Sequence, residues 1–163
     1  MATLREVLER ILSSRLSSPS VELANAMMDS STWTAAIRGS GTAGTYQILS
    51  QNCRYSRIGR RIFLDLNITM AAAVTGGGTG ALNITGVPFA KIADAFPIGA
   101  VSLDGLDWTA GALLALTFTT AGAGSTLQIR ETNDNAAAAG LAVSAIAAND
   151  VIAGSISYET ADA

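Results

Sequence analysis

Histidine is absent from all 163 residues of the chain. Its absence excludes Ser-His-Asp and Cys-His triads, a histidine general base and any histidine-ligated metal. A single cysteine, Cys53, rules out an internal disulfide and every multi-cysteine zinc or iron–sulfur site, and we expect it to be a small buried residue. The sequence therefore predicts no enzymatic activity, no catalytic or metal site and no cofactor.

Charge is also scarce. Charged residues make up 14% of the chain, against about 25% in an average soluble domain. The net charge is −3 and the isoelectric point is about 4.8, which argues against a nucleic-acid partner because such proteins usually carry a basic face. A surface with so few charges is typical of a protein that other subunits cover.

What the chain has in excess is small residues, with 16 glycines and about 30 alanines. At 16.6 kDa one domain is expected, with a core of small and β-branched side chains. Residues 108–129 carry no charge and are long enough to cross a bilayer. Because they contain three glycines and six hydroxyl residues, we interpret them as a strand, a turn and a strand, and expect no membrane partner.

The first 44 residues differ in character from the rest. Residues 3–16 have the spacing of an amphipathic helix, and Pro19 opens a second short helix that is expected to end near Met28. Residues 32–44 are Ser, Thr, Ala and Gly with a single Trp33 and indicate a linker or docking arm. The apolar positions of the first helix are Leu4, Val7, Leu8, Ile11 and Leu12.

This apolar stripe has three interpretations. It could pack on its own domain, join a helical bundle in an oligomer, or dock into a partner. The arm that follows favours the last two. Charges at Arg5, Glu6, Glu9 and Arg10 argue against a secretory signal.

From residue 45 onward, apolar residues recur at every second position instead of at helical spacing. Residues 61–70 alternate apolar and polar side chains over ten positions, which predicts a strand with one buried face. The fold class predicted is mainly β: an antiparallel β-sandwich or jelly roll of about eight strands over residues 45–163, preceded by the helical anchor and linker arm, residues 1–44. Residues 136–149 could form either a strand or a helical turn. The other expected strands are 46–49, 54–58, 81–85, 98–103, 113–119, 126–131 and 155–159.

Three motifs contain residue types that occur in ligand sites. Residues 39–44 match the glycine pattern of dinucleotide-binding loops, but a strand rather than a helix is expected to follow, so we reject this function. Asp104 and Asp107 flank a turn and are expected to be solvated rather than paired for hydrolysis. Residues 133–135 with Glu131 are interpreted as a polar turn, since their spacing matches no calcium loop.

One basic cluster stands out, because nine of the ten basic residues are arginine. Two interpretations remain open. These arginines could protect a strand edge from aggregation, or they could form a subunit interface through bidentate contacts. The cluster is Arg54, Arg57, Arg60 and Arg61.

Three segments together resemble the β-sandwich modules of tailed-bacteriophage virion proteins, which occur in tail fibres, head fibres and capsid decoration proteins. They are residues 55–62 (YSRIGRRI), 78–89 (GTGALNITGVPF) and 154–160 (GSISYET). Val87 stands where the family usually has leucine. The resemblance covers about residues 45–160.

The resemblance implies a homotrimeric, jelly-roll-like module that projects from the virion. Because only 44 residues precede it, we expect a capsid decoration (cement) protein on the capsid surface, made in the bacterial host cytoplasm and bound to the major capsid protein. The helix stripe and Trp33 would be its anchor. The alternative is the receptor-binding tip of a tail or head fibre that recognises a host glycan or surface protein, with Trp108 and Phe96 as candidate contacts.

Overall fold

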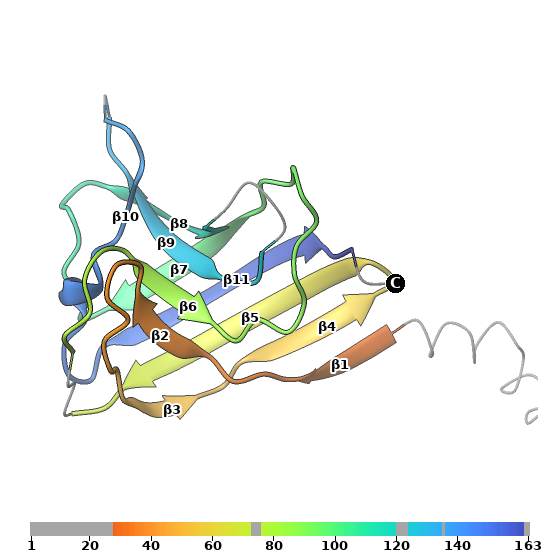
Figure 1. Cartoon of the computed structure of the whole chain (residues 1–163), viewed down its shortest axis with the longest axis horizontal. Coiled ribbons are helices and arrows are strands. Elements are labelled where there is room, and N and C mark those ends of the chain that lie inside the picture. The colour runs from red at the N-terminus through yellow and green to blue at the C-terminus, as the bar shows by residue number, and fades with distance from the viewer. Residues whose placement is uncertain (1–27, 73–75, 120–123, 135, 162–163) are drawn as a thin grey trace, which may run out of the picture.

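A computed structural model describes residues 28–72, 76–119, 124–134 and 136–161, and these ranges are almost entirely β-structure (Figure 1). Besides one short 3-10 turn, η1 (Val143–Ala145), this part of the chain contains eleven strands. The prediction of a mainly β fold is therefore confirmed. The strands are β1 (Met28–Thr32), β2 (Ala36–Gly39), β3 (Ile48–Gln51), β4 (Arg54–Ile58), β5 (Arg61–Met70), β6 (Leu82–Thr85), β7 (Ile98–Asp104), β8 (Leu113–Phe118), β9 (Leu127–Thr132), β10 (Ala139–Gly140) and β11 (Val151–Glu159).

All the strands belong to one antiparallel sheet in the order β1-β4-β5-β11-β7-β8-β9-β6-β2, while β3 pairs with β5 and β10 with β9. The sheet curls strongly into a half-barrel, so that β6 and β2 lie over the long strands β5 and β11 (Figure 1). The prediction of a two-sheet sandwich or jelly roll with about eight strands is corrected here. Because β7 pairs with both β11 and β8, the hydrogen bonding continues from one half of the sheet to the other.

Gly99 lies where β7 passes between the two halves. A Cβ atom at this position would lie 2.2 Å from the Ser155 carbonyl oxygen and 2.7 Å from the Ile156 Cβ atom. Only a residue without a side chain fits this approach, which is the usual reason for glycine at a sharply bent strand. The curl of the sheet thus depends on a backbone contact between β7 and β11.

The core fills the concave side of the sheet. In β5 the alternate residues Ile62, Leu64, Leu66, Ile68 and Met70 are buried, and each residue between them is at least partly exposed. This confirms the predicted strand residue for residue. Full burial of one such side chain stabilises the fold by about 1.5–3 kcal/mol, and β11 pairs with nine residues of β5.

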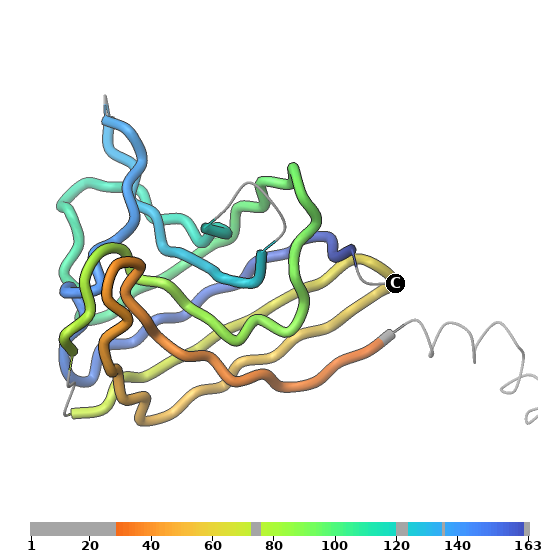
Figure 2. The backbone as a smooth tube through the Cα atoms, in the orientation of Figure 1, coloured from red at the N-terminus to blue at the C-terminus, as the bar shows by residue number. Residues whose placement is uncertain are grey.

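Residues 28–39 join the two edges of the sheet, as the backbone tube shows (Figure 2). Between β1 and β2, the Trp33 amide donates to the Cys53 carbonyl oxygen (3.1 Å) and the Ala35 amide donates to Gln51 Oε1 (2.7 Å). We call residues 33–35 the seam. The prediction of a linker or irregular arm over residues 32–44 is wrong for this stretch, because Trp33, Ala35 and Ile37 are all buried in the core.

The two N-terminal predictions have different outcomes. Residues 3–16 and most of the expected second helix lie outside the described residues. Met28, the expected end of that helix, is the first residue of β1. Residues 136–149, left open as strand or helix, contain the two-residue strand β10 and the turn η1, with Leu141, Val143 and Ile146 buried.

Candidate functional site

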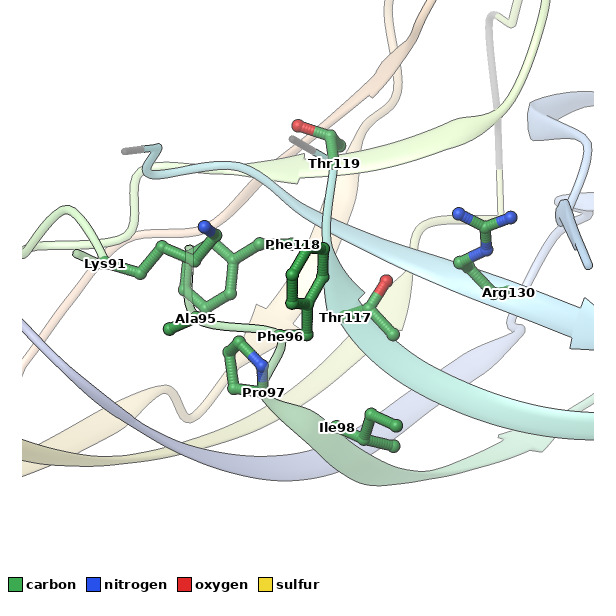
Figure 3. Close-up of a pocket in the computed structure, with 9 residues that line it drawn as sticks. All are labelled: Lys91, Ala95, Phe96, Pro97, Ile98, Thr117, Phe118, Thr119 and Arg130. Atoms are coloured by element: carbon green, nitrogen blue, oxygen red, sulfur yellow. The ribbon is translucent and has the colours of Figure 1, made fainter. Parts of the chain in front are cut away.

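A cavity of about 230 Å³ lies between the segment that precedes β7 and the adjoining ends of β8 and β9 (Figure 3). We call it the basic cavity, because two of its lining side chains are cations and, among the described residues that line it, none is acidic. In a chain of net charge −3, such a lining favours an anionic group over a cationic one. The lining residues are Lys91, Ala95, Phe96, Pro97, Ile98, Thr117, Phe118, Thr119 and Arg130.

Lys91 is the only lysine of the chain and is almost completely buried, with 1% of its surface exposed. Its backbone bridges to both Gly124 and Thr160, and its amide donates to the Gly124 carbonyl oxygen (2.9 Å). The Lys91 Nζ atom donates to the Ile92 carbonyl oxygen at 3.2 Å. A buried ammonium group is costly unless polar groups surround it, and the Ile92 carbonyl oxygen is one such group.

Two phenylalanines supply the apolar part of the wall. Phe118 is buried and makes an edge-to-face contact with Tyr158, the ring centroids being 4.8 Å apart. The Tyr158 hydroxyl in turn donates to the Phe89 carbonyl oxygen (2.9 Å), and burial raises the pKa of this phenol. Phe96 is instead 75% exposed. One ring is therefore fixed in the core and the other stands at the solvent-facing side.

Arg130 and Thr117 lie on neighbouring strands of the same sheet, β9 and β8. The Arg130 guanidinium donates to the Ala138 carbonyl oxygen through Nη2. Within the described residues, Arg130 Nε and Thr117 Oγ1 are buried without a hydrogen-bond partner. Leaving such a group unpaired costs about 1–3 kcal/mol, so both atoms lower the stability of this part of the sheet.

The predicted anchor is placed only in part. Leu4, Val7, Leu8, Ile11 and Leu12 lie outside the described residues. Trp33 is only 7% exposed and belongs to the core of the half-barrel. Its ring is therefore occupied by contacts within this chain and is not presented to a partner.

The four arginines of the basic cluster are divided between different neighbours. Arg57 Nε donates to the Gly59 carbonyl oxygen (2.7 Å), and its guanidinium lies 5.2 Å from the centre of the Phe89 ring, a cation–π contact. Arg60 Nε donates to the Thr160 carbonyl oxygen (3.0 Å), which ties the β4–β5 turn to the end of β11. These two side chains hold the fold together.

The other two members of the cluster are exposed on strands. Arg54 Nε donates to Asn52 Oδ1 (3.0 Å), and Arg61 Nη2 donates to Ser157 Oγ (2.9 Å). The interface role remains a prediction for Arg54 and Arg61. Protection of a strand edge fits neither residue, because β4 pairs with β1 and β5, and β5 pairs with β4 and β11.

The convex side of the sheet carries exposed apolar side chains. We call Ile58, Phe63, Ile98 and Leu113 the outer apolar face; they come from β4, β5, β7 and β8 and point away from the core. A hollow of about 450 Å³ lies between Phe63 and Ile98 above Gly99. Contiguous exposed apolar surface marks contacts with other proteins, and of these four residues Phe63 and Ile98 line the same hollow.

The remaining motifs have structural roles. Residues 39–44 form a turn held by the Gly39 amide on the Ala43 carbonyl oxygen (2.9 Å), and the next element is β3, so the dinucleotide motif is again rejected. Glu131 accepts hydrogen bonds from the Thr109 amide (2.9 Å) and hydroxyl (3.1 Å).

Among the described residues no group of three or more Cys, Asp or Glu could hold a metal ion, and no helix is long and apolar enough to span a membrane. Cys53 is buried, and burial raises the pKa of its thiol. A raised pKa lowers the thiolate fraction and makes the side chain less reactive.

The fold and the cavity together define a curled, single-sheet β-module with a small basic cavity. No protein-family model matches the sequence, and neither does any curated protein. Among solved structures, the chain is similar to the crystal structure of Dettilon tailspike protein (gp208), with a TM-score of 0.59 and 12% sequence identity over 79% of this chain. The chain spans 23% of the length of that tailspike chain.

At this identity the similarity concerns the fold: the chain has the fold of part of a phage tailspike. The expected resemblance to β-modules of tailed-phage virion proteins is thus supported at the level of architecture. It does not distinguish the parts of the virion that carry such modules.

Proposed function

We propose that the chain is a structural module of a tailed-bacteriophage virion and that it contacts the host surface from the tip of a fibre or spike. The observation that carries this proposal is the fold shared with Dettilon tailspike protein over 79% of the chain. The basic cavity and the exposed Phe96 beside it add a recognition site of the kind a receptor-binding module needs. This favours the receptor-binding alternative over the cement role.

Binding rather than catalysis is the activity we propose. The chain has no histidine, and none of the described residues that line its cavity is a carboxylic acid that could transfer a proton. We further propose that copies of the chain associate as a homotrimer through the outer apolar face. Burial of Phe63 and Ile98 against a neighbouring copy would explain why such side chains remain on a charge-poor surface.

The test is a comparison of two targets. The purified, fluorescently labelled full chain is mixed either with cells of the bacterium that the phage infects or with capsids stripped of accessory proteins. We expect saturable binding to the cells and competition with adsorption of the intact phage. Binding to the capsids without binding to the cells would overturn the proposal.

The second candidate is the capsid decoration role. The charge-poor outer apolar face suits a protein packed against a shell as well as one packed against its own copies. In that role the anchor would depend on the predicted helix, since Trp33 is buried in the core. Leu8→Asp in the full chain should then abolish capsid binding, whereas it should leave cell binding unchanged if the module is a receptor-binding tip.

A further inference from the structure

We propose that the loop between β7 and β8, residues 105–112, is a rigid recognition loop whose Trp108 stacks against a neutral sugar ring of a host-surface glycan. This inference deepens the proposed function and rests on it. Three features carry it: the hydrogen bonds that fix the loop, the exposure of Trp108, and the place of the loop in the module.

The loop is tied to the sheet by one carboxylate. Glu131 accepts a hydrogen bond from the Thr109 amide (2.9 Å) with one oxygen and a second from the Thr109 hydroxyl (3.1 Å) with the other. We call these two bonds the brace. Hydrogen bonds to a carboxylate are stronger than those between neutral groups. The backbone of Glu131 is itself paired on both sides, with Leu114 of β8 and with Ala139 of β10, so the brace starts from a fixed strand.

The residues on both sides of Trp108 are fixed as well. Leu106 is buried in the core, and the Ala112 amide donates to the Thr109 carbonyl oxygen (3.0 Å), which closes a turn at the end of the loop. Trp108 therefore lies between a buried anchor and the braced Thr109. Because the loop is already ordered, little conformational freedom is lost when a ligand binds, and this favours affinity.

Trp108 is the side chain that this rigid loop leaves accessible. It is 37% exposed, whereas Trp33, the other tryptophan, lies in the core. Residues 109–112 carry no side chain larger than threonine and so do not shield the ring on that side. Tryptophan supplies a large, stiff contact surface and is enriched among the residues that dominate binding energy.

The groups beside the ring favour a sugar over a protein partner. Asp107 and Thr109 are exposed on either side of Trp108 and offer oxygen acceptors. A pyranose presents an apolar C–H face to an aromatic ring and a rim of hydroxyl donors to such oxygens. The Asp107 carboxylate disfavours an acidic sugar. A protein partner would instead need a cluster of large side chains that excludes water, and residues 109–112 contribute none.

The loop lies at the end of the sheet away from the predicted anchor. Asp104 pairs with Val151 at the start of β11, whereas Glu159 at the end of β11 pairs with Arg61 at the β4–β5 turn (Figure 1). β1 begins at Met28 beside that same turn, so residues 1–27 are attached at the opposite end from the loop. Attachment through those residues leaves the loop free to face a host surface.

Chemical treatment of host cells tests the class of partner. Cells of the bacterium that the phage infects are treated either with periodate, which cleaves the vicinal diols of sugars, or with a broad-specificity protease. We expect the fluorescently labelled full chain to lose binding after periodate and to keep it after protease. Binding that survives periodate and is lost after protease would overturn the glycan in favour of a surface protein.

The two tryptophans allow the contact to be located. Protein labelled with 5-fluorotryptophan gives one ¹⁹F resonance for each, and Trp108→Phe assigns them by removing one. We expect polysaccharide extracted from the surface of the same bacterium to shift the Trp108 resonance saturably, while the resonance of the buried Trp33 stays in place as an internal control. Saturable binding without a shift of the Trp108 resonance would overturn the assignment.

Variants separate the ring from the brace. Trp108→Ala should weaken binding to cells at least about tenfold, or about 1.4 kcal/mol, whereas Leu49→Ala, an exposed apolar residue on β3, should not. Circular dichroism verifies that each variant is folded.

The brace is tested through Thr109, which positions Trp108. Thr109→Val removes the hydroxyl bond to Glu131 and should weaken binding about threefold while it narrows the Trp108 ¹⁹F resonance, because the loop then moves more freely. Thr109→Ser keeps both bonds and should behave like the wild type. Thr119→Val, at an exposed threonine outside the loop, is the matched control. An unchanged linewidth and affinity in Thr109→Val would exclude the brace as a positioning device.

The inference and the proposed function can fail separately. If the wild type binds host cells and a folded Trp108→Ala variant binds them equally well, the loop assignment is wrong and the proposed function stands. If the wild type binds capsids and not cells, the proposed function is wrong and the recognition role of Trp108 fails with it.

Discussion

Replacement of Gly86 by alanine should reveal how tightly the seam closes the half-barrel. Gly86 follows β6 and has a φ of +92°, a backbone conformation that residues with side chains rarely adopt. A Cβ atom there would lie 2.1 Å from the Thr34 carbonyl oxygen, which belongs to the seam. Gly86→Ala therefore strains the backbone and also forces the seam away from the end of β6.

The two effects can be separated with a matched control. Gly111 has a similar φ of +80°, but an added Cβ would meet nothing within 4 Å. In Gly111→Ala, strain of about 1–2 kcal/mol is partly offset by about 0.4–1 kcal/mol from the stiffer unfolded chain, so the net loss should be about 1 kcal/mol. Gly86→Ala adds about 1–3 kcal/mol for the forced displacement, for a total loss of about 2–4 kcal/mol.

Urea denaturation followed by tryptophan fluorescence measures both losses, since Trp33 lies in the seam next to Thr34. For a chain of this size each kcal/mol lowers the melting temperature by about 2–4 °C, so Gly86→Ala, about 1–3 kcal/mol less stable than the control variant, should melt about 2–12 °C below it. If the two variants lose the same free energy within about 0.5 kcal/mol, the seam does not hold the sheet closed and the reasoning is refuted.

Three further predictions concern the core and the outer apolar face. Trp33→Ala should lower the free energy of unfolding by about 3–5 kcal/mol in urea titrations. The milder Trp33→Phe should leave binding to cells or capsids unchanged. If a folded Trp33→Phe variant no longer binds, Trp33 belongs to the anchor after all. Because burial raises the pKa of Tyr158, its phenol contributes to the stability of the fold below the pKa of about 10 that it has in the unfolded chain. This contribution is lost as the pH rises above that value. Tyr158→Phe should therefore lower the free energy of unfolding by about 1 kcal/mol near neutral pH. In urea titrations at alkaline pH, the free energy of unfolding of this variant should fall less steeply with pH than that of the wild type, and parallel curves for the two proteins would contradict this. Phe63→Ser should shift sedimentation from trimer toward monomer while Leu49→Ser does not, and an unchanged trimer would exclude Phe63 from the interface.

The strands that the sequence predicted best are those with one face in the core and one in water. β4 and β5 were placed residue for residue because Arg61–Met70 alternates without interruption and a glycine marks the turn before it. The alternation of Trp33, Ala35 and Ile37 through the seam into β2 was missed, because the residues between them are Thr and Ala and carry little polar contrast. Where both faces of a strand carry small residues, the alternation of buried and exposed positions is present but hard to detect from the sequence.

The curl of the sheet could not be predicted in the same way. It depends on the approach of Gly99 to Ser155 and on β7 pairing with both β11 and β8, contacts between residues more than fifty positions apart in the first case. Strand content alone does not distinguish one curled sheet from two packed sheets, since both bury alternate residues.

The basic cavity shows the same limit for function. Phe96 was predicted as an exposed aromatic and is exposed, but Lys91, Phe118 and Arg130 were not recognised, because no motif joins them and only the curled sheet brings them together. One signal was available: Lys91 is the only lysine among ten basic residues. A lone lysine in an arginine-rich, charge-poor chain is a candidate for a buried, specific position.

The position of Ile98 relates the two surfaces of the module. Ile98 lines both the basic cavity and the hollow beside Phe63, so the border of the cavity is also part of the outer apolar face. A neighbouring copy that covers Phe63 therefore approaches the rim of the cavity without contacting Lys91, which is buried behind it. In the proposed function, association of copies and contact with the host would therefore use adjacent parts of one sheet.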